Sequence, residues 1–315
     1  MTAAAAFHRV SAMPPAPQVA VVVVSYNTRG LLLACLASII ESTRGRQVEC
    51  LVVDNASTDG SAEAARAAHP QAVVISNADN RGFAAACNQA IRQTRAPTIL
   101  LLNSDARLTA QAFDALAACL RQNERCGAAG CRVVNDEGVA VNARNFLTPF
   151  NQALELVGVK LGKRLRRTRQ PQPDRRGVDC DVDWIDGACL MLRRAAFDEA
   201  GGFDERFFMY SEDEDLCFRL RQRGWTVCLT ADAEVWHQGG ASSALKPREM
   251  LVHFYAGQMR FLDKHRGRTS AALYRLMMTL ALWLKRLLRP RGRREELSER
   301  LRALRRAAAS IRASG

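Results

Sequence analysis

The stretch that decides the fold is 19–27, with the sequence VAVVVVSYN. Its apolar residues run without interruption from Val19 to Val24, and most of them are β-branched. Such a run predicts a strand that is buried on both faces of a sheet. Three similar runs follow, at 50–55 (CLVVDN), 72–77 (AVVISN) and 97–105 (PTILLLNSD). We therefore expect four strands in the first third of the chain.

Helical patterns separate these runs, at 28–42, 61–69, 83–94 and 109–123. Strands that alternate with helices indicate βαβ units and a mostly parallel sheet flanked by helices, which is an α/β fold. Ligands bind beyond the carboxyl ends of the strands in such sheets. We expect the functional site at that edge.

The chain divides into three parts by composition. Residues 1–18 lack the basic start and long apolar middle of a signal peptide and are predicted to be a flexible leader. One domain is expected over 19–245, and a helical tail over 246–315. The ten cysteines include no CxxC pair, and most stand singly among apolar neighbours, which favours a reducing, cytoplasmic location.

The net charge of +13 belongs to the tail. Residues 246–315 hold 18 Lys/Arg and 5 Asp/Glu, while residues 1–245 are neutral overall. A neutral body and a tail without interleaved aromatics argue against nucleic-acid binding. The apolar segment 271–289, with Arg275, Lys285, Arg286 and Arg289, predicts a helix lying on an anionic membrane surface. The alternative is that the tail packs on the body or on a second copy in a homo-oligomer.

A second basic segment lies inside the predicted domain. Residues 160–176 hold eight basic residues, one acid and two prolines, a composition that predicts a mobile loop.

Polar residues follow three of the predicted strands. Asp54 could accept a hydrogen bond from a base N–H, although a turn and helix cap is an equal alternative there. Asp105, at the tip of a strand, could bind a hard divalent cation, and the alternative is an ordinary turn at the strand end. The first strand is not followed by GxGxxG, which disfavours a dinucleotide site.

Two further segments carry candidate chemistry. The run MYSEDED at 209–215 offers Glu212 and Asp213 at a helix start, where one acid could act as a general base. The alternative is a solvated acidic helix start. In VWHQGG, His237 is a candidate metal ligand or a structural histidine.

Taken together these segments resemble the family 2 glycosyltransferases of the GT-A fold, especially the bacterial rhamnosyltransferase-like branch. The matching segments are VVVVSYN, VDNASTDGS, NRGFAAACNQA, LLNSDA, DGACLMLRRAAFDEAGGFDERFFMYSEDEDLCFRL and VWHQGG, in order over about 19–240. The resemblance implies a GT-A domain followed by the basic helical extension.

The resemblance also implies residue roles. The nucleotide-sugar donor would be bound by residues that lie at the strand ends and in or just before the helical segment 83–94. These residues are Ser25, Tyr26, Asn27, Asp54, Asn80, Asn88, Asn103 and Asp105. Asn103 stands where the family has the first acid of its DxD motif. Mg²⁺ or Mn²⁺ would therefore be bound mainly by Asp105, with His237 as the second ligand. Asp213 would be the catalytic base with Glu212 assisting, and the acceptor side would include Trp184, Asp186 and Gly187.

The implied function is an inverting sugar transfer to a glycan or lipid-linked acceptor in cell-surface polysaccharide assembly. The first expectation for the donor is dTDP-rhamnose, followed by UDP- or GDP-linked hexoses. The alternative from another class is a catalytically silent nucleotide-sugar-binding protein. We expect the enzyme to work on the cytoplasmic face of the plasma membrane as a peripheral protein.

Overall fold

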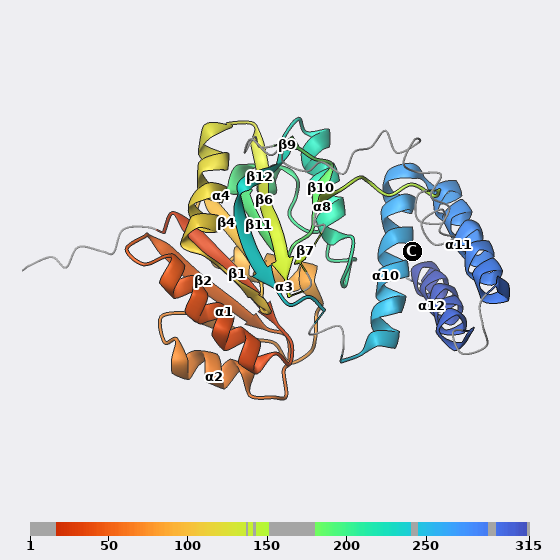
Figure 1. Cartoon of the computed structure of the whole chain (residues 1–315), viewed down its shortest axis with the longest axis horizontal. Helices are drawn as coiled ribbons and strands as arrows, with labels where there is room; N and C mark the ends of the chain where they lie inside the picture. The colour runs from red at the N-terminus through yellow and green to blue at the C-terminus, as the bar shows by residue number, and fades with distance from the viewer. Residues whose placement is uncertain are drawn as a thin grey trace, which may run out of the picture.

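A computed structural model describes residues 17–136, 138–140, 143–150, 180–240, 245–288 and 294–313 (Figure 1). The predicted basic loop at 160–176 and most of the predicted leader lie outside these residues. The described chain forms one large sheet with helices on both faces and a layer of three C-terminal helices at one end (Figure 1). The predicted α/β fold with a helical extension is confirmed.

The first half of the sheet is parallel, as predicted. Its strands are β1 (Val19–Ser25), β2 (Val48–Asp54), β3 (Val73–Ser76) and β4 (Thr98–Asn103), in the spatial order β3-β2-β1-β4. The register pairs Ser25 with Asp54 and Val24 with Asn103. The polar strand ends therefore lie side by side at one edge of the sheet.

The second half is mixed, which the sequence did not show. β11 (Cys189–Arg193) runs antiparallel to β4 and to β6 (Cys126–Asn135), and β12 (Thr226–His237) then runs parallel to β6. The short β5 (Ala106–Arg107) closes the order beside β12. Smaller pieces are β7 (Gly138–Ala140) on β6, β9 (Cys180–Asp181) on β12, and the separate pair β8 (Ala143–Arg144) and β10 (Trp184–Ile185).

β6 was missed because its first residues are small. A Cβ at Gly127 would lie 2.9 Å from Cβ of Trp225, and one at Gly130 would lie 2.6 Å from Cγ2 of Ile185. These glycines allow neighbouring side chains to pack directly on the strand backbone, so the segment lacks the apolar bulk that normally marks a strand.

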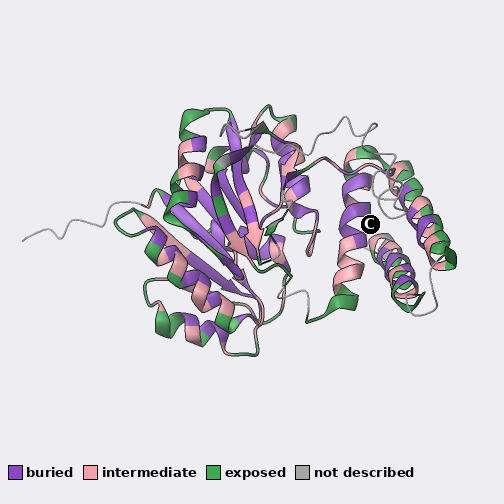
Figure 2. Cartoon of the chain, in the orientation of Figure 1, coloured by how far each residue is buried: buried purple, intermediate pink, exposed green. Residues whose placement is uncertain are grey.

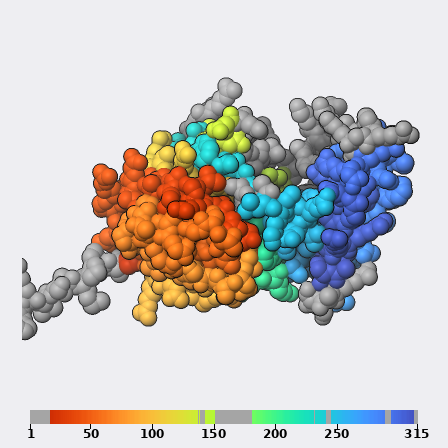
Figure 3. Space-filling view, turned by 90° about the horizontal axis from the view of Figure 1, so that it is seen from below, coloured from red at the N-terminus to blue at the C-terminus, as the bar shows by residue number. Residues whose placement is uncertain are grey.

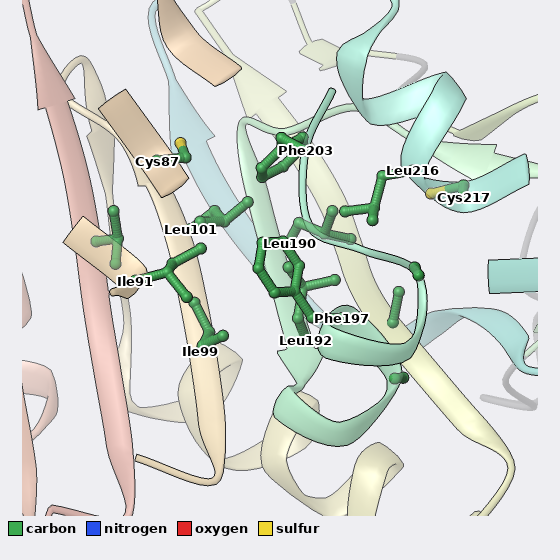
Figure 4. Packing of buried hydrophobic residues seen from close by; sticks show 14 of the residues in the cluster. Cys87, Ile91, Ile99, Leu101, Leu190, Leu192, Phe197, Phe203, Leu216 and Cys217 are labelled. Atoms are coloured by element: carbon green, nitrogen blue, oxygen red, sulfur yellow. The ribbon is translucent and has the colours of Figure 1, made fainter. Parts of the chain in front are cut away.

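The two faces of the sheet carry separate apolar cores (Figure 2). Val21 and Val23 face α1 (Arg29–Ser42), α2 (Ser61–Ala68) and α4 (Ala110–Gln122). Ala20 and Val22 face the other layer, made of α3 (Phe83–Ile91), α7 (Arg194–Glu199) and α8 (Glu212–Gln222). Figure 4 shows this second core, where side chains of α3, β4, β11 and α8 converge. Because the side chains of β1 alternate between the two faces of the sheet, this strand packs against both helix layers.

The C-terminal helices are α10 (Pro247–Arg266), α11 (Arg268–Leu288) and α12 (Arg294–Ala313). They form a third core that includes Phe207 and Leu147 of the body, and they occupy one end of the molecule (Figure 3). Asp215 of α8, fully buried, accepts hydrogen bonds at 2.7 Å from Lys264 and His265 of α10. The tail therefore packs on the body, which was one of the two alternatives. Among the described helices none has the length and apolar content of a membrane span.

One segment of the body is held between α3 and α10. Phe208 accepts a hydrogen bond of 2.8 Å from the N–H of Phe83, and a Cβ on Gly82 would overlap the Phe208 carbonyl. Tyr210 and Ser211 have φ of 71° and 66°, a region that non-glycine residues rarely adopt. On the other side, a Cβ on Gly257 of α10 would overlap the Tyr210 carbonyl oxygen. Packing from both sides maintains this strained backbone directly before α8.

This close approach predicts opposite effects for two Gly→Ala changes in helices. Gly257→Ala should lower the free energy of unfolding by about 1–3 kcal/mol, because the methyl group overlaps the Tyr210 carbonyl. Gly30→Ala, where a Cβ meets nothing within 4 Å, should raise it by about 0.5–1 kcal/mol. Denaturant unfolding of both variants measures this. A stabilised Gly257→Ala protein would contradict the close approach of α10.

Candidate active site

Hydrogen bonds tie the carboxyl ends of β1 and β4 together. The buried Ser25 hydroxyl lies 3.0 Å from the Thr28 hydroxyl, which in turn donates to the Ser104 hydroxyl at 3.0 Å. The Thr28 hydroxyl thus holds the Asn103–Asp105 turn against the end of β1, and Ser25 is linked to that turn through Thr28.

Asn27 links the ends of β1 and β2. It has φ of 51°, its N–H donates to the Ser57 hydroxyl at 2.8 Å, and its Oδ1 accepts the Thr58 N–H at 2.7 Å. Asparagine tolerates the left-handed region because its short side chain can bond locally. This bonding fixes the loop that follows Asp54.

Asp54 is buried and half satisfied. Its Oδ2 accepts the Ser57 N–H at 3.1 Å, while its Oδ1 has no hydrogen-bond partner within the described part of the chain. A buried polar atom without a partner is costly, and a ligand N–H donor would remove that cost. The geometry therefore fits the predicted base-recognition role, which stays a prediction.

The pairing of β5 with β12 brings His237 to Asp105. Their ladder pairs His237 with Ala106, so the imidazole Nε2 lies 3.0 Å from Oδ1 of Asp105 and 3.2 Å from Nδ2 of Asn103. Burial by itself lowers the pKa of His237, but the hydrogen bond to Asp105 and the charges of Asp105 and Asp186 raise it overall. Two residues separated by most of the domain sequence thus form one pair.

This pair suits a divalent cation. A carboxylate oxygen and an imidazole nitrogen are ligand types that Mn²⁺ accepts, and Mg²⁺ binds through one or two carboxylates together with substrate phosphates. Asp105 and His237 already lie within hydrogen-bond distance, and both are mostly buried. The donor set fits the predicted metal ligands, although no observation identifies the ion.

Asp186 connects this pair to the acidic start of α8. Burial raises the pKa of Asp186 to about 7, the Asp213 charge adds to the rise, and Arg144 and His237 oppose it. Its Oδ1 has no hydrogen-bond partner among the described residues. Asp186 is thus close enough to both Asp213 and His237 to feel their charges, so the predicted metal and base positions belong to one site.

Asp213 is oriented by backbone groups. Its Oδ2 accepts the Gly187 N–H at 3.0 Å and its Oδ1 accepts the Glu214 N–H at 2.8 Å. Burial raises the pKa of Asp213, and these two hydrogen bonds limit the rise. A carboxylate whose pKa is shifted toward neutrality by burial is suited to general base catalysis.

The neighbouring acids have other environments. Glu212 is buried, its Oε2 has no hydrogen-bond partner within the described residues, and burial and the Asp213 charge raise its pKa well above the usual value. Glu214 accepts the Leu147 N–H at 2.6 Å, and burial raises its pKa to about 8. The run is therefore not the solvated helix start of the alternative interpretation.

Several predicted residues have structural partners. The Asn88 side chain bonds to the backbone of Phe203. It accepts a hydrogen bond from the Phe203 N–H at 3.0 Å and donates one to the Phe203 carbonyl at 2.9 Å. Asn80 accepts the Gly82 N–H at 3.0 Å. Trp184 donates to the Asn145 carbonyl at 3.1 Å and packs against the core. These contacts organise the site's walls, and their roles toward ligands stay predictions.

Two residues of the site were missed by the sequence analysis. Arg144, on β8, lowers the pKa of both Asp186 and Asp213 through its charge. The pKa of the exposed Lys246 is raised by Glu249 and by Tyr26, which places this lysine beside a predicted donor residue. Arg144 lies in a stretch without clear periodicity, and Lys246 lies at the start of the tail, so only the fold reveals their positions.

A mixed sheet whose parallel strands β1–β4 end in polar residues, with helices on both faces, has the arrangement of the GT-A fold. The mannosyltransferase PcManGT from Pyrobaculum calidifontis, solved in complex with GDP-Man and Mn²⁺, has a similar fold. Its TM-score is 0.55 at 17% identity, over 95% of this chain and 76% of that one.

The chain belongs to glycosyltransferase family 2, because residues 15–256 match the family described as "Glycosyltransferase like family 2". It is 32% identical over 277 residues to the N-acetylglucosaminyl-diphospho-decaprenol L-rhamnosyltransferase of Mycobacterium tuberculosis, covering 83% of this chain and 90% of that protein. A shorter match, 46% identical over 46 residues, is to the rhamnosyltransferase WbbL of Escherichia coli, covering 15% of this chain and 17% of that one.

Proposed function

We propose that the chain is an inverting glycosyltransferase that moves rhamnose from dTDP-rhamnose to a hydroxyl of a lipid-linked glycan during cell-surface polysaccharide assembly. The observation that carries this proposal is the convergence of Asp105 with His237 and of Asp186 with Asp213 at one edge of the sheet. The rhamnosyltransferase relatives support the donor sugar, and the lipid-diphosphate named for the mycobacterial relative supports the acceptor class.

The residues of the chain divide the reaction between them. Asp54, with its unpartnered Oδ1, accepts an N–H of the donor base, and Tyr26, which follows the Ser25 that pairs with Asp54, lines the same base-binding region. Asp213, held by the N–H groups of Gly187 and Glu214, takes the proton of the acceptor hydroxyl. The acceptor oxygen then bonds to the anomeric carbon while the bond to the nucleoside diphosphate breaks. A single displacement from the opposite face inverts the anomeric configuration.

The leaving diphosphate needs positive charge nearby. Asp105 and His237 would hold a Mg²⁺ or Mn²⁺ ion, which supplies neutralisation of the charge that develops on the diphosphate. Lys246 lies next to Tyr26 and adds a cationic side chain at the same edge. Both features act where the negative charge grows, as transition-state stabilisation requires.

Two other assignments remain alternatives. A UDP- or GDP-linked hexose would use the same acid pair with a different base contact at Asp54. A catalytically silent nucleotide-sugar-binding protein would keep the donor pocket but would not need Asp213 oriented toward an acceptor. The two backbone hydrogen bonds on Asp213 favour the enzyme.

Replacing the proposed base tests the activity directly. In a donor screen with a membrane lipid extract as acceptor, Asp213→Asn should lower turnover by about a hundredfold or more, because the amide cannot take the proton. Glu214→Gln is the matched control: it is adjacent and buried, and its amide oxygen can still accept the Leu147 N–H. It should keep most of the turnover.

The readout is release of nucleoside diphosphate and transfer of the sugar to the acceptor. Transfer in wild type that persists in Asp213→Asn would remove Asp213 as the base. Donor binding without transfer in wild type, with every donor and the extract, would support the silent binder instead.

The tail supports attachment to a membrane surface, which we propose as the location of the enzyme on the cytoplasmic face. α11 buries Tyr274, Met278 and Leu282 against its neighbours. Its other side exposes an apolar stripe at helical spacing: Leu273, Leu276, Leu280, Trp283, Leu284, Leu287 and Leu288. Lys285 and Arg286 border this stripe, and Arg286 stacks on the Trp283 ring. An apolar stripe bordered by basic residues suits the interface of an anionic bilayer.

Removing part of the stripe should weaken binding to vesicles. Leu280→Ser with Leu287→Ser should reduce partition onto anionic phospholipid vesicles about tenfold, because two exposed leucines lose their apolar contact with the lipid. Val73→Ser, a change at an exposed apolar residue of β3 in the body, is the control and should bind as wild type does. Equal binding of all three proteins in vesicle sedimentation would exclude this surface as the membrane contact.

A further inference from the structure

Two cysteines that are close in sequence meet a third, distant one beside the sheet. Cys119 lies near the end of α4, Cys126 begins β6, and Cys228 lies near the start of β12. Their three sulfur atoms all lie within 4.8 Å of one another, and all three residues are buried. The sequence analysis interpreted Cys119 and Cys228 as single buried cysteines and gave no sign of this cluster, because Cys228 lies about a hundred residues from the other two.

Polar groups lie around the three-cysteine cluster. The Asn123 side-chain amide donates to the Cys228 sulfur at 3.8 Å, and the Thr226 hydroxyl lies 3.6 Å from it. The sulfurs of Cys119 and Cys126 and these two polar groups therefore surround the Cys228 sulfur.

A fixed positive charge lies next to the cluster. The Arg193 guanidinium donates through Nε to the Cys126 carbonyl at 3.1 Å, and through an Nη atom to the Asn123 carbonyl at 3.2 Å. The backbone carbonyls of Cys126 and Asn123 therefore orient this guanidinium group. A positive charge here offsets part of the negative charge that three thiolates would create.

The cluster is separate from the catalytic edge. Cys228 pairs with Ala129 of β6 while Trp236, next to His237, pairs with Val134, so five residues of β6, roughly 17 Å of extended strand, separate the two positions. The polar strand ends that form the active site all lie at the other edge of the sheet. The three cysteines therefore contribute nothing to the sugar transfer itself.

From this geometry we propose that Cys119, Cys126 and Cys228 form a binding site for one thiophilic metal ion, and that this ion is Zn²⁺. Zinc–sulfur bonds of about 2.3 Å place ligating sulfurs roughly 3.8 Å apart, so small side-chain rotations suffice to close the present arrangement. Soft thiolates select Zn²⁺ or Cu⁺ over Mg²⁺ and Mn²⁺. A fourth position, where four-coordinate zinc needs one, would go to the Thr226 hydroxyl or to water.

Such a site would act as a cross-link in the fold. It joins a helix end to the first residues of two neighbouring strands, and it closes the long chain segment between Cys126 and Cys228. Binding displaces thiol protons, so affinity should rise with pH. Because the ion binds the folded chain, it should also raise the unfolding temperature.

The test uses the full chain, purified under reducing conditions and stripped of metal. Addition of Co²⁺ as a spectroscopic probe should produce sulfur-to-cobalt charge-transfer absorption at one equivalent, and Zn²⁺ should abolish it. Asp105 and His237 contain no sulfur, so a metal ion bound there cannot give this band. Absence of the band in wild type would overturn the proposal without any variant.

Variants then assign the ligands. Cys126→Ala and Cys228→Ser should each weaken Zn²⁺ binding about a hundredfold or more in competition with a chromophoric chelator. Cys217→Ala is the matched control, since Cys217 is as deeply buried as Cys126 but lies on α8, and it should bind Zn²⁺ as wild type does. If Cys126→Ala fails to fold, Cys228→Ser decides. Unchanged affinity in Cys228→Ser would overturn the assignment.

Discussion

The register between β1 and its two neighbours is the constraint on which the active site depends. Because Ser25 pairs with Asp54 and Val24 pairs with Asn103, three polar strand ends meet at the same height of the sheet. A slip of one residue would turn each side chain to the opposite face. The alternating cores make such a slip costly, since Val21 and Val23 fill one core and Ala20 and Val22 fill the other. Apolar packing thus positions polar chemistry.

The proposed catalytic acids depend on a second constraint, the packing of α10. The backbone at Tyr210 and Ser211 adopts a conformation that is unfavourable for these residues, and it directly precedes α8, which begins at Glu212. Gly257 allows α10 to lie against it. Behind it, burial alone would raise the pKa of Asp215, but the hydrogen bond from His265 and the charges of Arg219 and Lys264 lower it. The tail therefore completes the site's support in addition to offering an exposed apolar stripe.

The first half of the fold was predictable because local pattern and tertiary role agree there. The four apolar runs and the helices between them lie close to their expected bounds, and Asp105 and His237 proved to be partners. The second half was hidden. β6 is rich in small residues that serve close packing, and β11 inserts antiparallel between β4 and β6 through contacts far apart in sequence. No local signal encodes such an insertion.

The site divides in the same way. The order of the motifs indicated Asp54, Asp105 and Asp213. It did not indicate that the Gly187 N–H orients Asp213, because these two residues meet only in the folded chain. The proposed donor contact at Asn88 meets a side chain already bonded to Phe203. The position of Arg144 and the three-cysteine cluster could not be predicted from the sequence. As with β11, they depend on contacts between segments that the chain brings together only when it folds.

We propose that one edge of the sheet holds a metal-dependent donor site and, beside it, a separate base. Calorimetric titration of dTDP, with and without Mn²⁺, into wild type, Asp105→Asn and Asp213→Asn tests this arrangement. Mn²⁺ should tighten dTDP binding about tenfold or more in wild type and in Asp213→Asn, and should have little effect in Asp105→Asn. The same Mn²⁺ enhancement in Asp105→Asn as in wild type would contradict it.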